Sequence, residues 1–262
     1  MKALSVAKIN ENLINEDAAT ANAHLIAVSD GAGGGGVFAE CWSRYLIEHL
    51  PDEPIADYKG FDQWIDKIWE PFYNDYEEKA KAKAEGGMLL NKFYDEGSFA
   101  TLVTIWKNGQ WISYGDSVAF CYDTVTKRLQ HSFTKLSDFN NSPFLINCKD
   151  PLDESGFRAG EFVLNDDCII FAASDALAHY VLMMYEVANS EKFADELQKA
   201  IDAQTKNSNF IKAAMFLKTV DFDKDVIKKL LNCSSWPFLK NHIKGLRKKG
   251  LIGHDDYSFV IF

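Results

Sequence analysis

The sequence predicts one α+β domain spanning residues 1–262, with antiparallel strands and helices in separate blocks. Strand-like runs rich in β-branched and aromatic residues cluster between residues 97 and 134, and helical periodicity dominates before and after them. Tight turns such as Asn108-Gly109 join neighbouring strands directly, as in hairpins. The sequence has no internal repeat, no low-complexity linker and no repeated strand–helix–strand pattern.

The N-terminal part is expected to contain one strand and two helices. Residues 24–30 (HLIAVSD) have the character of a short apolar strand that stops at an acid, and a glycine cluster follows at 31–36. Apolar side chains then recur at helical spacing over 37–50, until Pro51 ends the pattern. A second helix is expected over 60–84, with an aromatic face that packs in the core. The residues of that face are Phe61, Trp64, Ile68, Phe72 and Tyr76.

The middle of the chain is expected to form a meander of strands. Residues 98–106, 110–114, 118–122 and 129–134 have the length and composition of strands. Residues 135–160 hold few apolar runs and several Asp, Asn, Pro and Gly residues. We therefore expect a long irregular segment there, of the kind that forms a flap.

The C-terminal part is expected to add two strands, then helices, then one last strand. Pro237 is expected to break the final helical stretch, because proline lacks the backbone N–H that a helix interior needs. The expected strands are 162–164, 168–173 and 257–262, and the expected helices are 176–189, 190–203 and parts of 209–250.

Charge and cysteine content limit the function. The chain has 38 acidic and 28 basic residues, a formal net charge of -10 and a pI near 5.1. Nucleic acids and anionic membranes both attract a basic surface, so we expect neither as a partner. Five widely spaced cysteines and a polar start without the apolar stretch of a signal peptide favour free thiols in a reducing compartment. We expect a cytoplasmic monomer.

Acidic residues stand where apolar strands end or tight turns begin, at five places along the chain. Carboxylates gathered without histidine or cysteine suit hard divalent cations such as Mg²⁺ and Mn²⁺. Two such ions can lower the pKa of a water molecule and clamp the oxygens of a phosphoryl group. A metal site is therefore expected if these acids converge in space. The five places are Glu16-Asp17, Asp30 before Gly31, Asp116, Asp175 and Asp255-Asp256.

The same acids fall within six short motifs, in the order NED, VSDGAGG, GSFATLV, YGDSVAF, FAASDALA and DDYSF. In this order and with these separations, the motifs resemble those of the PPM family, the metal-dependent serine/threonine protein phosphatases of type 2C. The resemblance runs from about residue 15 to 262, nearly the whole chain. It implies a four-layer αββα sandwich, in which two antiparallel β-sheets are flanked by helices and the metals lie at one end.

The resemblance also assigns metal ligands. Asp30 is similar to the acid that bridges two metal ions, and the Gly31 carbonyl is similar to a ligand of one of them. Asp175 and Asp255 match ligands of the other ion. The cofactors implied are two Mn²⁺ or Mg²⁺ ions, with a third, weaker site in some members.

Three further acids have their own roles in this resemblance. Glu16 matches an acid that acts through metal-bound water, and Asp17 follows it as a residue that orders the site. Asp116 matches an acid linked with the third, weaker metal. Together with Asp30 and Asp175, Glu16 is expected to carry catalysis.

The reaction implied is hydrolysis of phosphoserine or phosphothreonine on a protein, by attack of the water that bridges the two metal ions. The metal charge would offset the negative charge on the transferred phosphoryl group. Two alternatives stay open. One is a catalytically weak or inactive binding module on the same fold, and the other is a phosphatase for a small phosphorylated metabolite.

The sequence departs from the family pattern at four positions. Members often carry an arginine that grips the phosphate where this chain has Asn12, and Lys8 is the nearby cation that could replace it, as a point charge and not a bidentate fork. Ala32 stands where many eukaryotic members have a histidine, and Ala176 stands where glycine is usual. His179 stands where an acid often follows, which weakens the expectation of a third metal.

The glycine cluster has a second interpretation. Gly31, Gly33 and Gly36 satisfy G-x-G-x-x-G between a strand and a helix, the fingerprint of dinucleotide binding. That site needs a second apolar strand ending near an acid, and the stretch LPDEPIADYKG supplies acids without a strand of normal length. The sequence therefore favours the metal site.

Overall fold

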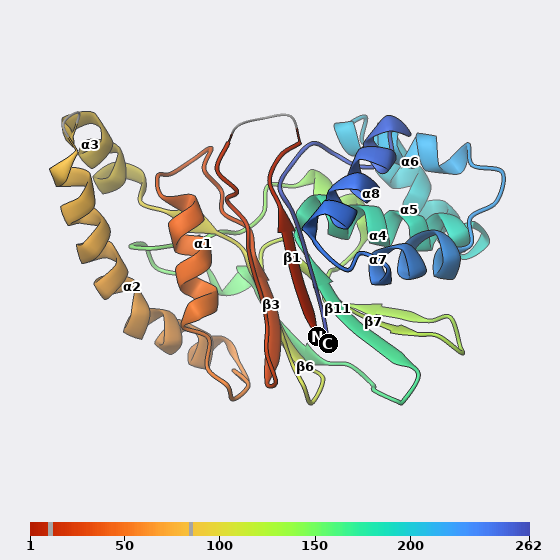
Figure 1. Cartoon of the computed structure of the whole chain (residues 1–262), viewed down its shortest axis with the longest axis horizontal. Helices are drawn as coiled ribbons and strands as arrows, with labels where there is room; N and C mark the ends of the chain where they lie inside the picture. The colour runs from red at the N-terminus through yellow and green to blue at the C-terminus, as the bar shows by residue number, and fades with distance from the viewer. Residues whose placement is uncertain (10–12, 84–85) are drawn as a thin grey trace.

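The computed structural model describes residues 1–9, 13–83 and 86–262. Two antiparallel β-sheets lie face to face, and helices cover the outer face of each (Figure 1). This is the four-layer αββα arrangement that the motifs imply, so the predicted fold class is confirmed. The two chain ends lie side by side, because the first and last strands pair with each other.

The first sheet has the strand order β1-β12-β11-β7-β8. These strands are β1 (Lys2–Val6), β12 (Tyr257–Ile261), β11 (Cys168–Ala173), β7 (Val118–Asp123) and β8 (Leu129–His131). Every pairing in this sheet is antiparallel. The strand expected over 129–134 therefore ends three residues early.

The second sheet has the order β10-β6-β5-β3-β2 and is also antiparallel throughout. Its strands are β10 (Phe157–Glu161), β6 (Gln110–Tyr114), β5 (Leu102–Trp106), β3 (Leu25–Ser29) and β2 (Ala18–Ala21). A separate short ladder joins β4 (Phe99–Ala100) to β9 (Ile146–Asn147). A dinucleotide-binding βαβ unit needs parallel strands, and every strand pairing among the described residues is antiparallel. The second interpretation of the glycine cluster therefore does not fit this fold.

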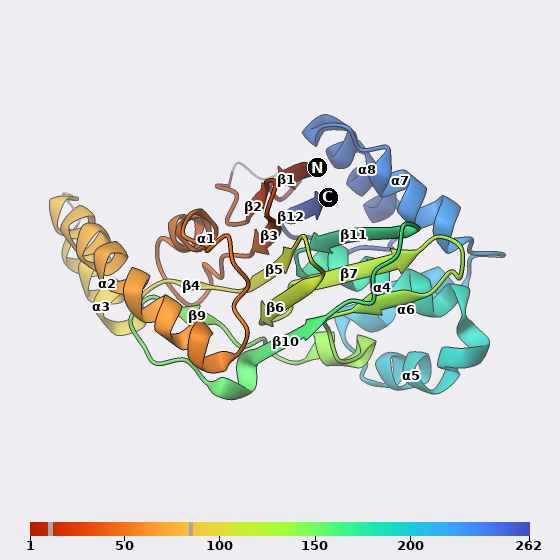
Figure 2. The same cartoon turned by 90° about the horizontal axis from the view of Figure 1, so that it is seen from below.

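Helices form the two outer layers, and Figure 2 shows the two groups at opposite ends of the molecule. The second sheet is covered by α1 (Ala39–Glu48) and α2 (Tyr58–Ala82), and α3 (Gly86–Glu96) packs on α2. The first sheet is covered by α4 (Asp175–Ala188), α5 (Ser190–Asp202), α6 (Lys206–Met215), α7 (Lys228–Leu231) and α8 (Trp236–Lys248). No helix in the described part of the chain is both long and apolar enough to cross a bilayer.

Strand β3 is buried on both faces. Leu25 and Ala27 pack outward, in the same cluster as Trp42 of α1, whereas Ile26 and Val28 pack inward between the sheets. Successive side chains of a strand point to opposite faces, so a strand between two layers must be apolar at every position. This explains the continuous apolar run that predicted the strand from sequence.

The predicted aromatic face of the second helix is confirmed. Phe61, Trp64, Ile68 and Phe72 are buried, and Tyr76 packs against the same cluster while half-buried. Helix α2 begins after Asp57, whose side chain accepts a hydrogen bond of 2.8 Å from the Gly60 backbone N–H. That carboxylate satisfies one of the donors that a helix N-terminus leaves unpaired.

Two further sequence-based expectations are wrong. The strand expected at 162–164 lies at 157–161 instead, on the edge of its sheet, where most of its residues are exposed or half-buried and an apolar run is not required. Pro237 does not break a helix but lies in the first turn of α8, a position where its missing N–H has no helical partner to lose.

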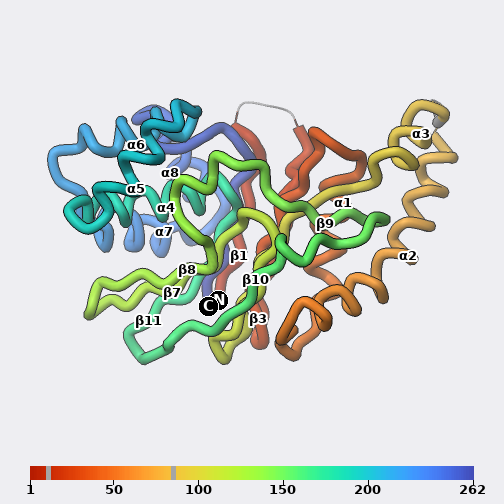
Figure 3. Tube along the Cα trace, turned by 180° about the vertical axis from the view of Figure 1, so that it is seen from behind, coloured from red at the N-terminus to blue at the C-terminus, as the bar shows by residue number. Residues whose placement is uncertain are grey.

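The irregular segment expected over 135–160 is confirmed for residues 135–156, and its last four residues belong to β10 instead. It contains two short 3₁₀ turns, at Leu136–Asn140 and Glu154–Gly156, and the two-residue strand β9. Figure 3 shows it crossing the back of the molecule from β8 of the first sheet toward α1. The segment therefore links the two halves of the sandwich at the end where the acidic residues gather.

Candidate functional site

Strand register brings the predicted acids to one end of the sandwich. In the second sheet, Ala18 pairs with Ser29, which places Asp17 beside Asp30. In the first sheet, Ala173 pairs with both Val118 and Phe259. Asp116 comes two residues before Val118, Asp175 two residues after Ala173, and Asp255 four residues before Phe259. Because the strands are antiparallel, all three acids lie at the same edge of the sheet. Five acids lie close enough to interact at this edge, namely Asp17, Asp30, Asp116, Asp175 and Asp255.

The acids interact electrostatically across the two sheets. Burial raises the pKa of Asp30 well above its usual range, and the charges of Asp17 and Asp175 raise it further. Burial likewise raises the pKa of Asp175, and Asp116 and Asp255 add to this shift. The pKa of Asp116 is raised to about 6, chiefly by burial. Acids that raise one another's pKa repel one another when ionised, and a cation relieves that repulsion.

Asp17 is the most deeply placed member of the group. Its side chain is 4% exposed. Burial raises its pKa to about 7, the hydroxyl groups of Ser174 and Ser258 oppose this shift, and the nearby Asp256 charge adds to it. A carboxylate buried among other acids is costly to ionise, and a bound cation would lower that cost.

Asp256 and Lys8 connect the two sheets next to the acids. The two carboxylate oxygens of Asp256 accept hydrogen bonds from the backbone N–H groups of Lys8, at 2.7 Å, and Glu16, at 2.8 Å. The Lys8 ammonium lies 3.3 Å from Asp255 Oδ1 and 3.6 Å from Glu16 Oε2. Although burial lowers the pKa of Lys8, the charges of Asp255, Asp256 and Glu16 raise it above its usual range. Lys8 is therefore an ammonium ion among the acids.

The glycine loop after β3 passes against Glu16. The Gly31 N–H donates to the Glu16 carbonyl at 3.2 Å, and a Cβ at position 31 would lie 2.6 Å from that carbonyl oxygen and 2.7 Å from the Ala39 oxygen. A Cβ at Gly33 would meet the Glu16 carboxylate at 1.8 Å. Neither glycine has a positive φ. Space therefore requires glycine at position 31, where the neighbours are backbone atoms, whereas the Glu16 side chain could move away from a Cβ at position 33.

Comparison with known proteins identifies the architecture. No family model matches the sequence, and no curated protein matches it as a relative. Solved structures match over 99–100% of this chain at 11–18% identity. The serine/threonine phosphatase Stp1 from Staphylococcus aureus is 13% identical with a TM-score of 0.51, and the match covers 99% of this chain and 92% of Stp1. PppA of Pseudomonas aeruginosa is 14% identical with a TM-score of 0.50, covering 100% and 96%. The PPM Ser-Thr phosphatase MsPP from Mycobacterium smegmatis, solved with cacodylate, is 12% identical with a TM-score of 0.50, covering 99% and 96%.

The chain has the PPM phosphatase fold. The resemblance inferred from six motifs is thus confirmed at the level of the fold. At such low identity the likeness carries no residue roles, so the site rests on this chain's own geometry.

The predicted residues take defined places in this PPM phosphatase fold. Asp30 directly follows β3, Asp175 begins α4 after β11, and Asp255 lies two residues before β12. Asp116 lies in the turn between β6 and β7, and Glu16 precedes β2. Asn12, where an arginine was expected to grip phosphate, lies outside the described residues.

The chemical type of the clustered side chains suits a hard divalent cation. Every candidate side chain in the group is a carboxylate, and the Asp17 side chain is buried. In the part of the chain that the structure describes, no three His, Cys, Asp or Glu side chains stand close enough together to hold an ion as they lie. Repelling carboxylates do not close around a point without a cation. The residues therefore fit such an ion in their chemistry. The carboxylates would have to move closer together to bind it.

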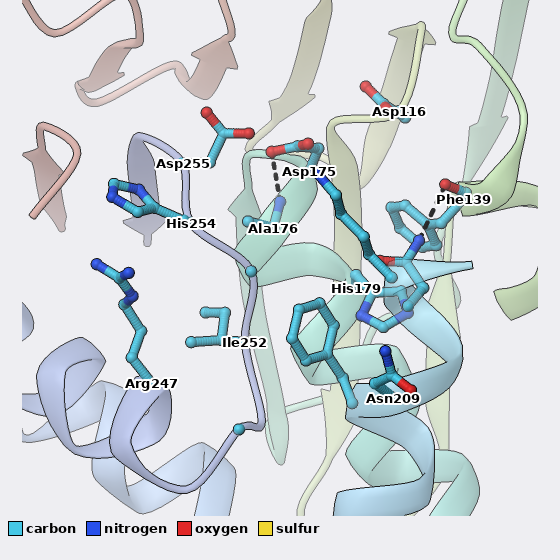
Figure 4. A pocket seen from close by; sticks show the side chains of 15 residues that line it. Asp116, Phe139, Asp175, Ala176, His179, Asn209, Arg247, Ile252, His254 and Asp255 are labelled. Atoms are coloured by element: carbon cyan, nitrogen blue, oxygen red, sulfur yellow. Dashed lines mark hydrogen bonds between the residues drawn. The ribbon is translucent and has the colours of Figure 1, made fainter. Parts of the chain in front are cut away.

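A pocket of ≈ 550 Å³ opens beside the acids. In Figure 4, Asp255, Asp175 and Asp116 lie along one rim, and His179 and Asn209 lie on the opposite side. The size is typical of ligand sites. The acid end is thus reachable by a substrate of some size.

His179 behaves as a neutral core residue at the edge of this pocket. It is 4% exposed, its ring stands edge-on to Phe139 at 5.3 Å, and Nε2 has no hydrogen-bond partner among the described residues. Burial lowers its pKa to about 4, so the ring is uncharged at neutral pH. It cannot supply the charge of the acid that often stands at this position.

Proposed function

We propose that the protein is a metal-dependent phosphatase that removes phosphate from serine and threonine residues of proteins. The observation that carries the proposal is the meeting of buried acids from both sheets at one end of a PPM phosphatase fold. The Stp1 and MsPP structures are described as serine/threonine phosphatases, which supports this substrate class. The same fold alone would support only a phosphatase-like architecture.

Asp30, the Gly31 carbonyl, Asp175 and Asp255 are the groups that would hold two Mn²⁺ or Mg²⁺ ions, with Glu16 acting through water. Asp116 would serve a third, weaker site. Ions held there lower the pKa of a water molecule and offset the charge of the phosphoryl group.

The remaining contacts position these groups. The Thr101 backbone N–H donates to the Asp30 carbonyl at 2.8 Å, and the Thr101 hydroxyl lies 3.3 Å from the Asp30 N–H. These bonds fix the chain where it leaves β3. Asp256 holds the backbone of Lys8 and Glu16 together, so the Lys8 ammonium stays at the rim that the phosphate would approach. Lys8 is thus placed to attract an anion.

The test is hydrolysis of p-nitrophenyl phosphate and a phosphothreonine peptide, with and without millimolar Mn²⁺. Turnover by the parent should depend on Mn²⁺, and Asp30→Asn should lower it by at least about a hundredfold, the upper end of the loss caused by removing even an outer-shell partner of a metal. Metal-independent turnover, or equal rates for parent and variant, would contradict the proposed site.

One observation favours the alternative of a binding module without catalysis. The Lys8 ammonium already pairs with Glu16 and Asp255, two of the groups assigned to the metals. If Lys8 permanently replaces a cation there, phosphoprotein would be bound and not hydrolysed. A folded parent that binds the phosphothreonine peptide but leaves it intact at every Mn²⁺ concentration would establish this alternative.

A further inference from the structure

Two basic side chains also line the pocket beside the acids. Lys206 begins α6 and Arg247 lies in the last turn of α8, and both line the pocket. Neither forms an ion pair with any described residue, in a chain of net charge -10. Arg247 makes one recorded hydrogen bond, from Nη1 to the Ile9 carbonyl at 3.4 Å. Within the described residues, two cations that form no ion pair thus line one cavity.

The side of the pocket formed by α6 also favours an anion. The first turn of α6 supplies Asn209 to the lining, and a helix N-terminus carries partial positive charge. Thr205 and Ser208 form a capping box, which holds this turn in place. The lining groups can donate several hydrogen bonds, whereas the acids stand together at the far rim.

Packing and hydrogen bonds hold the floor of the pocket in place. His179 lies between the rings of Phe139, at 5.3 Å, and Phe210, at 6.2 Å, and is 4% exposed. Its Nε2 atom has no partner among the described residues, although a buried polar atom normally has one. The Asn207 amide donates to the Phe139 carbonyl at 3.1 Å, which ties α6 to the segment before β9. A ligand entering this pocket therefore meets walls that packing and hydrogen bonds hold in place.

We propose that this pocket binds a second anionic group of the substrate, next to the phosphorylated residue, through Arg247 and Lys206. This inference rests on the proposed phosphatase function and names its substrate class. The group is the carboxylate of an acidic residue or a second phosphate. Either group carries a negative charge that Arg247 and Lys206 would attract. The phosphoryl group to be removed would lie beside Asp175 and Asp255.

The experiment compares three phosphothreonine peptides of one sequence, in which the positions on both sides carry Asp, Asn or a second phosphothreonine. The quantity measured is kcat/KM with Mn²⁺, for the parent and for Arg247→Gln, Lys206→Gln and Lys244→Gln. Lys244 is an exposed residue of α8 outside the pocket lining, so its variant removes the same charge elsewhere.

The parent should prefer the Asp peptide over the Asn peptide by about tenfold, the ratio that a charged contact of ~1.4 kcal/mol gives. Arg247→Gln and Lys206→Gln should each remove most of that preference, mainly through KM, and Lys244→Gln should retain it. A stronger preference for the doubly phosphorylated peptide would identify phosphate as the source of the anion. No preference in the parent, or the same preference in all variants, would overturn the proposal.

A binding measurement separates this proposal from the phosphatase proposal. If the parent hydrolyses no peptide, fluorescein-labelled Asp and Asn peptides can be bound at equilibrium and followed by fluorescence anisotropy. Tighter binding of the Asp peptide, lost in Arg247→Gln and retained in Lys244→Gln, would support the pocket while the catalytic assignment fails. Equal binding of both peptides by the parent would overturn the pocket itself.

Discussion

Asp256 has a distinct role from its neighbour Asp255. Both were noted in sequence as one acidic pair before the last strand, and they differ in what they contact. Asp256 is 2% exposed and accepts two backbone hydrogen bonds, whereas Asp255 faces the pocket and pairs with Lys8. A carboxylate whose two oxygens accept backbone donors is satisfied within the protein and orders the chain around it. Asp255 remains the one available to a ligand.

Glu186 of α4 gives a pH dependence at the scale of one residue. It is 3% exposed, and burial raises its pKa from 4.5 to about 8, with Glu196 adding to the shift. The folded state therefore holds a proton that the unfolded state releases, so stability should fall as pH rises from 4.5 to 8. Glu186→Gln should be more stable than the parent at pH 8, by about 1–3 kcal/mol, with the difference shrinking at pH 5.

Urea unfolding at both pH values measures this difference. The matched control is Glu161→Gln, which changes an exposed glutamate of β10 and should behave as the parent does. A Glu186→Gln variant that is destabilised equally at both pH values would contradict the assignment of a buried, protonated carboxyl.

At the scale of one element, the loop between β3 and α1 depends on missing side chains. A Cβ at Gly31 would contact two backbone oxygens below 3 Å, and neither can turn aside as a side chain could. Gly31→Ala should therefore destabilise the protein by about 1–3 kcal/mol, as overpacking does. Thermal unfolding would show it. Gly34→Ala is the control, because nothing lies within 4 Å of a Cβ there. Equal stability of the two variants would contradict this account of the loop.

The elements that the sequence did not predict share a physical reason. β1 and β2 are short, and their residues are partly exposed, so no apolar run indicates them. They become strands because β12 and β3 supply the partner hydrogen bonds. Helix α3 forms against α2, again through tertiary contact. β3, β7 and β11 were predicted well, since burial on both faces forces an apolar sequence.

At the scale of the whole molecule, the sequence predicted which residues belong to the candidate site. It did not predict how they lie in space. The motifs gave the acids, but only strand register and the packing of two sheets bring Asp30 near Asp175. The sequence indicated Lys8 as a cation near the site and Arg247 as part of a basic run, but neither the ion pairs of Lys8 nor the pocket beside Arg247 follows from their spacing. The extent of one domain over residues 1–262, the cytoplasmic location and the monomeric state stay predictions.

The central claim is that acids from both sheets form one site for divalent metal. Isothermal titration of the folded parent with Mn²⁺ tests it without relying on turnover. We predict binding of about two ions per chain, as in two-metal phosphatases, and an affinity lowered by about 10–100-fold in Asp30→Asn. A folded parent that binds no Mn²⁺, or an Asp30→Asn variant that binds it as tightly as the parent, would contradict the account.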